Sequence, residues 1–302
     1  MKIDAFLSHW KHSKGCSPPT IKAYASDLRH FESFLKGRGL RITQVRPSTM
    51  NEYIAEMQTA PNLRFGRVGL SDATIARRIA AISSYFEYLR VARNMRLTNP
   101  AAALRRRWKT NRKPKAAAEK SLEVLLEGTI SLRDKAILTL FLSTGLRLSE
   151  LAQLNRDSIK IRMETRDGQR LVSGSGEVLG KGSKVRTFFV DGRTLAVLRD
   201  YLKSRTDSEA ALFLSQRGKR MSGRAIQQMI ATLCRSLGIE HIHPHTLRHN
   251  FAHRLANADI DLRILTGLMG HSNPATTQIY FELTDKTLAR GYFSAMEFRN
   301  AE

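Results

Sequence analysis

A short basic segment divides this chain into two parts. Residues 101–118 contain seven Lys or Arg side chains and no Asp or Glu. Like charges repel one another, so such a stretch stays extended unless a polyanion neutralises it. The Asn99-Pro100 pair that precedes it also disfavours the continuation of a helix. We therefore expect a linker at 101–118 that separates a domain at 1–100 from a second domain at 119–302.

The first part shows the periodicity of amphipathic helices. Ser17-Pro18-Pro19 suits a helix start, and apolar residues follow it at three- and four-residue steps as far as Leu35. Ser71 is a good N-cap for a second such pattern that continues to Leu89. Shorter helical patterns lie around 3–10 and 50–57. This spacing predicts a small helical bundle.

The second part alternates helical patterns with short β-branched segments. It predicts a mainly helical domain with a small antiparallel sheet, so the expected fold class for the whole chain is mainly α. The expected helices are 131–142, 146–154, 193–204, 222–237, 245–257 and 261–269, and the expected strands are 159–162, 178–179 and 185–190.

The charge balance indicates a polyanionic partner. The chain has 50 Lys and Arg against 27 Asp and Glu, a formal net charge of +23, and pairing of phosphates with such cations releases condensed counterions. Composition alone leaves ribosomal binding, membrane-surface binding and a merely basic protein open. No apolar run reaches the roughly 18 residues of a membrane span, and the first residues lack the apolar centre of a signal peptide. Cys16 and Cys234 lie far apart and form no CxxC pair, so we expect a cytoplasmic protein without disulfides.

Four segments of the second part carry residues suited to phosphate chemistry: TGLRLSEL (144–151), GKGSKVR (180–186), HPHTLRHNFAH (243–253) and LMGHSNPATTQIY (268–280). Their order and spacing resemble the catalytic boxes of the tyrosine recombinases, or phage integrase family, and most closely the compact Xer-type members. The resemblance implies a core-binding domain at 1–100, a catalytic domain at 119–302 and site-specific cleavage and rejoining of DNA. It also implies a 3′-phosphotyrosyl intermediate, a Holliday junction and a tetramer, of one chain type or two, on two double-stranded DNA sites. Because the phosphotyrosyl linkage conserves the phosphodiester energy, neither ATP nor a metal is expected.

Two arginines suit the binding of a phosphodiester. A guanidinium fork can hold two phosphate oxygens, which a lysine does less well. The resemblance assigns this role to Arg147 and Arg248, and Glu150 could orient Arg147 from one helical turn away. Taken singly, each arginine is more often a surface or ion-paired side chain.

The remaining site residues are two histidines, a tyrosine and a lysine. An imidazole can donate to phosphate or relay a proton near neutral pH, and the resemblance assigns proton transfer to His245 and phosphate binding to His271. Tyr280, nine residues after His271, is the expected nucleophile, although a phenol with a pKa near 10 is normally weak. Lys181 is the expected general acid for the leaving 5′ oxygen, and Lys184 is its competitor.

Several alternatives stay open at this point. His245, His249 and His253 recur every four residues, a spacing used by zinc ligands, but no carboxylate base accompanies them; otherwise His249 is expected to buttress the site. A DNA-binding regulator without catalysis and a type IB topoisomerase-like enzyme also fit the charge and the tyrosine.

The sequence leaves the role of the C-terminal segment and the biological task of the protein open. A plausible helix at 284–299 could dock on a neighbouring subunit or pack on its own domain. Chromosome-dimer resolution, phage integration and transposon movement stay open, as do the DNA site, accessory proteins and cleavage in cis or in trans. The candidate DNA-contacting residues are Arg77, Arg78, Arg105, Arg106, Arg107 and Lys109, each of which could instead lie on an ordinary solvated face.

Overall fold

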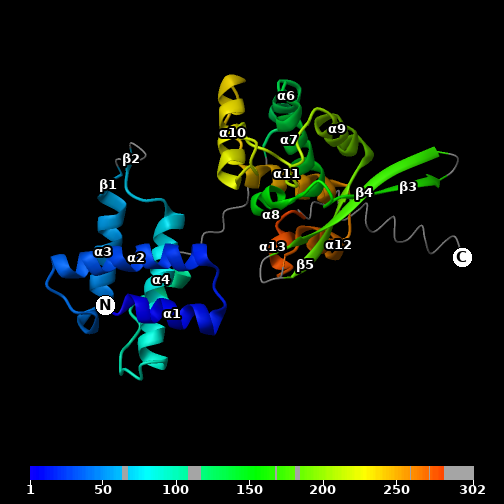
Figure 1. Cartoon of the computed structure of the whole chain (residues 1–302). Coiled ribbons are helices and arrows are strands. Elements are labelled where there is room, and N and C mark those ends of the chain that lie inside the picture. The colour runs from blue at the N-terminus through cyan, green and yellow to red at the C-terminus, as the bar shows by residue number, and fades with distance from the viewer. Residues whose placement is uncertain are drawn as a thin grey trace, which may run out of the picture. The chain divides into compact units, whose positions relative to one another are not determined.

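The structure, a computed structural model, describes the chain outside 63–66, 108–116, 167–168, 181–183, 259, 272 and 282–302. The Cα positions group into two units, Met1–Arg112 and Lys113–Glu302 (Figure 1). The expected tail helix at 284–299 and residues 108–116 of the expected linker lie outside the described residues. Among the described helices, none combines the length and apolar character needed to cross a bilayer.

The first unit is a helical bundle, as predicted. Its α4 begins at the expected Ser71, whose hydroxyl accepts the Thr74 backbone N–H at 3.3 Å. The apolar faces of its helices form one core that includes Phe6, Phe31 and Ile75. Its elements are α1 (Ile3–Lys14), α2 (Pro18–Gly37), the 3-10 helix η1 (Ile42–Gln44), α3 (Pro47–Thr59), β1 (Pro61–Asn62), β2 (Arg67–Val68), α4 (Asp72–Val91) and α5 (Ala102–Arg107).

Helix α5 differs from the extended conformation expected for the start of the linker. Ala101 is fully buried and Leu104 packs against the core of the first unit. Burial of these apolar side chains stabilises a helix where charge repulsion alone favours an extended chain.

The second unit is built around the buried helix α7, against which α9 and α11 pack. Leu140 and Phe141 of α7 are fully buried in its core. The described cysteines are both unpaired, as expected. The elements are α6 (Glu119–Glu127), α7 (Leu132–Thr144), α8 (Leu148–Gln153), β3 (Lys160–Arg166), β4 (Gln169–Leu179), β5 (Val185–Val190), α9 (Gly192–Lys203), α10 (Gly223–Ser236), α11 (Pro244–Asn257), α12 (Leu262–Met269) and α13 (Ala275–Gln278).

The sheet of the second unit is antiparallel, in the order β3-β4-β5. Its first two strands are longer than the short segments predicted, because the ladder from Lys160↔Ser175 to Arg166↔Gln169 pairs backbone groups of polar as well as apolar residues. Strand β5 pairs with β4 only from Gly174 to Leu179, so β3 and the first part of β4 form a two-stranded extension (Figure 1). The other end of β4 leads to Gly180 and the site described next.

Candidate active site

A tight turn between α7 and α8 places Arg147. Gly145 has a φ of +58°, the left-handed region that glycine adopts most easily. A Cβ atom there would lie 2.2 Å from Cδ1 of Phe251, so the turn packs directly on α11. Arg147 then occupies the N-cap of α8, and Glu150 accepts its backbone N–H at 2.8 Å. The turn at Gly145 and the start of α8 therefore position both Arg147 and Glu150, which form an ion pair.

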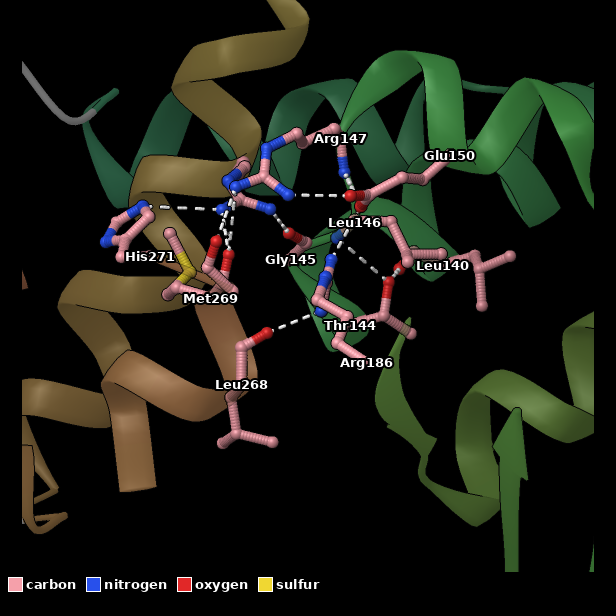
Figure 2. Close-up of polar contacts among 12 residues, drawn as sticks. Leu140, Thr144, Gly145, Leu146, Arg147, Glu150, Arg186, Leu268, Met269 and His271 are labelled. Carbon is pink, nitrogen blue, oxygen red and sulfur yellow. Dashed lines mark hydrogen bonds and ion pairs between the residues drawn. The ribbon is translucent and has the colours of Figure 1, made fainter. Parts of the chain in front are cut away.

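Glu150 is buried between two guanidinium groups (Figure 2). Its Oε1 accepts from Nη1 of Arg147 at 2.7 Å, and its Oε2 accepts from Nη2 of Arg186 at 2.6 Å. Burial alone would raise the pKa of Glu150, but the hydrogen bonds and charges of Arg186 and Arg147 lower it below its ordinary value. The carboxylate therefore stays ionised and orients both arginines.

Arg248 of α11 is the most deeply buried cation of the cluster, with 2% of its surface exposed. Its Nη1 donates to the Gly145 carbonyl at 2.6 Å, and its Nη2 donates to the Met269 carbonyl. Burial, together with the nearby charges of Arg147 and Arg186, lowers the pKa of Arg248 to about 9. Because that value lies above neutral pH, the guanidinium remains charged and is fixed in direction by two carbonyls.

The C-terminal end of α12 supplies further acceptors to this cluster, as Figure 2 shows. The Leu268 carbonyl accepts from Arg186, the Met269 carbonyl from Arg248, and the Gly270 carbonyl from Arg147 at 2.8 Å. Carbonyls at a helix C-terminus are unpaired within the helix and carry partial negative charge. We call these three groups the α12 carbonyls. They stabilise the cations without adding further carboxylates that would repel a phosphate.

His271 follows the α12 carbonyls and lies against Arg248. Its Nδ1 is 2.8 Å from Oγ1 of the buried Thr277, and its Nε2 is 3.4 Å from Nη2 of Arg248. Arg248 can only donate, so in this arrangement Nε2 is the accepting nitrogen and Nδ1 carries the proton. Burial and the charges of Arg248, Arg147 and Arg186 lower the pKa of His271 to about 4.

Tyr280 is buried beside a histidine of α11. Its Oη is in hydrogen-bond contact with Nδ1 of His249, and the two ring centroids are 5.7 Å apart. Burial raises the pKa of the Tyr280 phenol to about 12, although Arg248 acts in the opposite direction. The short α13, which begins after Pro274, connects His271 to this tyrosine.

A cavity of about 1010 Å³ opens onto this cluster and is lined by Arg147, His245, Arg248 and His249. His245 is exposed in its wall, and partial desolvation with the charges of Arg248 and Arg147 lowers its pKa. Tyr280 does not line the cavity, but it contacts His249, which does. An anion in this cavity would meet two guanidinium groups and two imidazoles.

Lys181 falls outside the described residues, but the chain on either side of it is placed. A Cβ atom at Gly180 would lie 3.7 Å from Nη1 of Arg147 and 3.9 Å from Oε1 of Glu150. The Gly180 N–H donates to the Lys184 carbonyl at 2.8 Å. The two residues that flank 181–183 are therefore hydrogen-bonded to each other, and Gly180 lies beside Arg147.

Sequence reasoning missed Arg186 and Thr277. Arg186 lies in β5, where alternate residues are buried, and it occupies a buried position together with Phe188 and Val190. An arginine at the core-facing position of an alternating strand is a signal that could have been recognised, because a buried charge needs partners. No comparable signal marks Thr277.

The zinc alternative does not fit the structure. Among the residues that the structure describes, no three His, Cys, Asp or Glu side chains form a group that could hold a metal ion. Nδ1 of His249 instead contacts Tyr280, and Nδ1 of His253 contacts Asn257 at 3.1 Å.

Two of the six candidate DNA-contacting residues are described with their side chains. Arg77 and Arg78 of α4 both pair with the buried Asp27 of α2. The Arg77 side chain keeps 42% of its surface exposed, whereas Arg78 keeps 14%. Arg78 therefore links α2 and α4, whereas the Arg77 side chain remains partly accessible to solvent. The side chains of Arg105, Arg106 and Arg107, and all of Lys109, lie outside the described residues.

Comparison with known proteins identifies related chains along almost the whole length. Residues 92–287 match the phage integrase family, and residues 3–93 match the phage integrase N-terminal SAM-like domain. The tyrosine recombinase XerC of Pseudomonas fluorescens is 35% identical over 97% of this chain and 95% of its own length. The tyrosine recombinase XerC of Chromohalobacter salexigens is also 35% identical, over 97% of this chain and 96% of its own.

Solved structures share the fold. The Tn1549 transposon integrase in complex with transposon right end DNA has a TM-score of 0.72 and 20% identity, with 98% of this chain and all of that chain covered. The XerH site-specific recombinase bound to difH substrate has a TM-score of 0.67 and 20% identity, with 97% of this chain and 84% of that chain covered. At 20% sequence identity, these two matches show a shared fold and no more.

Proposed function

The chain belongs to the phage integrase family and is a tyrosine-type site-specific DNA recombinase, and we propose that Tyr280 is the nucleophile with which it cuts DNA. One observation carries this assignment. Three segments far apart in sequence bring Arg147, Arg248, His271 and Tyr280 into one cluster beside a cavity. Each of these side chains has a use in phosphodiester cleavage, and no carboxylate other than Glu150 accompanies them among the described contacts.

The arginines and His271 suit the two non-bridging oxygens of the phosphodiester. Arg147 and Arg248 are already oriented by Glu150 and by the α12 carbonyls, so little reorganisation is needed when the phosphate arrives. A phosphate oxygen would replace Arg248 as the partner of His271, which then donates from Nε2. Binding of the anion thus favours protonation of His271, against the low pKa of the empty site.

Cleavage needs a proton donor for the departing 5′ oxygen, and we assign this role to Lys181. Its support is the position of Gly180 beside Arg147, because Lys181 is the next residue in the sequence. A 5′ hydroxyl from another duplex would reverse the reaction. Exchange of both pairs of strands, through a Holliday junction, then completes recombination.

We further propose that residues 1–100 and 119–302 bind opposite faces of a DNA site and that 101–118 runs along the DNA backbone. Arg77 contributes to phosphate contact through its exposed edge, and Arg105, Arg106, Arg107 and Lys109 contribute from the linker. Two duplexes exchanged at both strands need four cleavages, so four chains, each with one Tyr280, assemble on two sites. We propose that the reaction takes place in the cytoplasm.

The test is covalent capture. Full-length protein is incubated with pooled, labelled genomic fragments that carry nicks, and SDS-resistant protein–DNA adducts are isolated and sequenced. We expect adducts enriched for one inverted-repeat site with the wild type, none with Tyr280→Phe, and adducts still formed with Tyr292→Phe, which removes the nearest competing tyrosine in the sequence. Adducts that persist in Tyr280→Phe would refute the assignment, and relaxation of supercoiled plasmid without site preference would favour a topoisomerase.

A further inference from the structure

The histidine that contacts the proposed nucleophile is not the one that the sequence favours for proton transfer. Nδ1 of His249 is in hydrogen-bond contact with Oη of Tyr280. His245 lies one turn earlier on α11, and its ring centroid is 4.5 Å from that of His249. His249 therefore stands between Tyr280 and His245.

His249 and Tyr280 are both neutral near pH 7, as transfer of a proton from Tyr280 to His249 requires. Burial and the charges of His245, Arg248 and His271 lower the pKa of His249 to about 4, so its imidazole is neutral near pH 7. Tyr280, with a pKa of about 12, is also neutral. A neutral phenol can donate to Nδ1 only if the imidazole carries its own proton on Nε2. The contact thus places an accepting nitrogen against the O–H bond that must break.

The same values show when the proton can move. A pKa of about 12 for the donor and about 4 for the acceptor make complete transfer in the empty site very unfavourable. A bound phosphodiester brings a negative charge next to Arg248 and the histidines, which raises the proton affinity of His249. Transfer is therefore coupled to formation of the bond between Oη and phosphorus.

We infer that His249 is the general base that accepts the proton of Tyr280 during DNA cleavage, an inference that rests on Tyr280 being the nucleophile. The Oη–H bond breaks as the Oη–P bond forms, and the proton goes to Nδ1 of His249. The P–O5′ bond breaks, and Lys181 supplies a proton to the 5′ oxygen. In rejoining, the His249 imidazolium returns its proton to Oη. His245, exposed in the cavity wall, assists by contact with the phosphate.

Two substitutions separate proton acceptance from simple holding of the tyrosine. In His249→Asn, the side-chain amide oxygen takes nearly the position of Nδ1 and can accept the same hydrogen bond, but it is not basic. In His249→Ala, both the contact and the base are lost. His253→Ala is the matched control, because His253 lies one turn later on α11, is exposed, and contacts Asn257 rather than Tyr280.

The measurement is the rate of adduct formation, under single-turnover conditions, on the nicked fragment that the wild-type protein captures. General acid–base catalysis contributes typically about 10²- to 10⁴-fold. We expect both His249→Asn and His249→Ala to slow adduct formation by at least about 10²-fold, added imidazole to restore part of the rate of His249→Ala, and His253→Ala to match the wild type.

Each other outcome is decisive. A rate for His249→Asn close to that of the wild type would show that His249 only holds Tyr280 and would overturn the inference. Faster adduct formation in His249→Ala would show that the contact with His249 holds Tyr280 away from the phosphate. This result would also overturn the inference. If His249→Ala does not fold, the comparison of His249→Asn with the wild type decides alone. Absence of adducts with the wild-type protein would instead refute the nucleophile itself, so the two failures are distinguishable.

Discussion

Glu150→Gln should destabilise the second unit while leaving the first unit unchanged. The substitution keeps the shape of the side chain but replaces one carboxylate oxygen by an NH₂ group, which cannot accept from a guanidinium. Arg147 still has the Gly270 carbonyl and 28% of its side chain exposed, so it can be satisfied elsewhere. Arg186 has only 7% of its side chain exposed and depends on Glu150 and the Leu268 carbonyl. The loss therefore falls mainly on Arg186.

The magnitude follows from the burial of that pair. Removal of one partner of a buried ion pair costs about 3–5 kcal/mol, and the remaining amide oxygen keeps one acceptor, so we expect about 3 kcal/mol. The control is Glu164→Gln, whose exposed pair with Arg162 is 3.6 Å long and should contribute under about 1 kcal/mol. Because the chain has two units, a single melting temperature would mix two transitions.

Hydrogen exchange followed by mass spectrometry resolves the units. The slowest amides of α7 report the opening of the second unit, and about 3 kcal/mol corresponds to roughly 10²-fold faster exchange. Amides of α4 should be unaffected. The pKa of Glu150 is lowered in the folded state, so its contribution is present above the unfolded carboxyl pKa and is lost as pH falls through the lower folded value. Exchange of the α7 amides in Glu150→Gln within threefold of the wild type would refute this account of the cluster.

Two other perturbations of the second unit have definite outcomes. Gly145→Ala should cost the second unit about 2–5 kcal/mol, measured from exchange of the slowest α7 amides, from about 1–2 kcal/mol for the left-handed backbone and about 1–3 kcal/mol for overpacking. Gly238→Ala, with a φ of +65° and no atom within 4 Å of the added Cβ, should lose only the backbone part, and equal losses would contradict the packing argument. Stability should also fall as pH falls from about 6.5 to about 4, because His249 and His271, with folded pKa values of about 4, bind protons only when unfolded. Unfolding free energies that do not differ between pH 7 and pH 5 would contradict this.

The sequence predicted the helices well because apolar periodicity and capping residues are local signals. The pattern after Ser17 corresponds to α2, and that after Ser71 corresponds to α4, with the N-cap hydrogen bond in place. The strands of the β3–β4 hairpin were predicted too short, at 159–162 and 178–179, because their pairing depends on backbone groups rather than on an alternating apolar pattern.

The sequence named candidate site residues but not the contacts between them. The boxes identified Arg147, Arg248, His271 and Tyr280 as candidates, and the structure brings all four together. The contact of His249 with Tyr280 spans 31 positions of sequence, and the acceptors for the arginines are main-chain carbonyls, which no side-chain pattern reveals. Lys181 stays a prediction, because it lies outside the described residues.

The α12 carbonyls have a consequence for the synthesis of this protein. Arg147, Arg186 and Arg248 are all translated before Leu268, Met269 and Gly270, which accept their hydrogen bonds. Domains fold as units while the N-terminal part of a chain emerges first, so a nascent chain carries the three cations before it has the groups that orient them. Tyr280 arrives later still. A polypeptide released before Tyr280 would therefore keep the three arginines and the basic side chains of the first unit, but it would lack the proposed nucleophile.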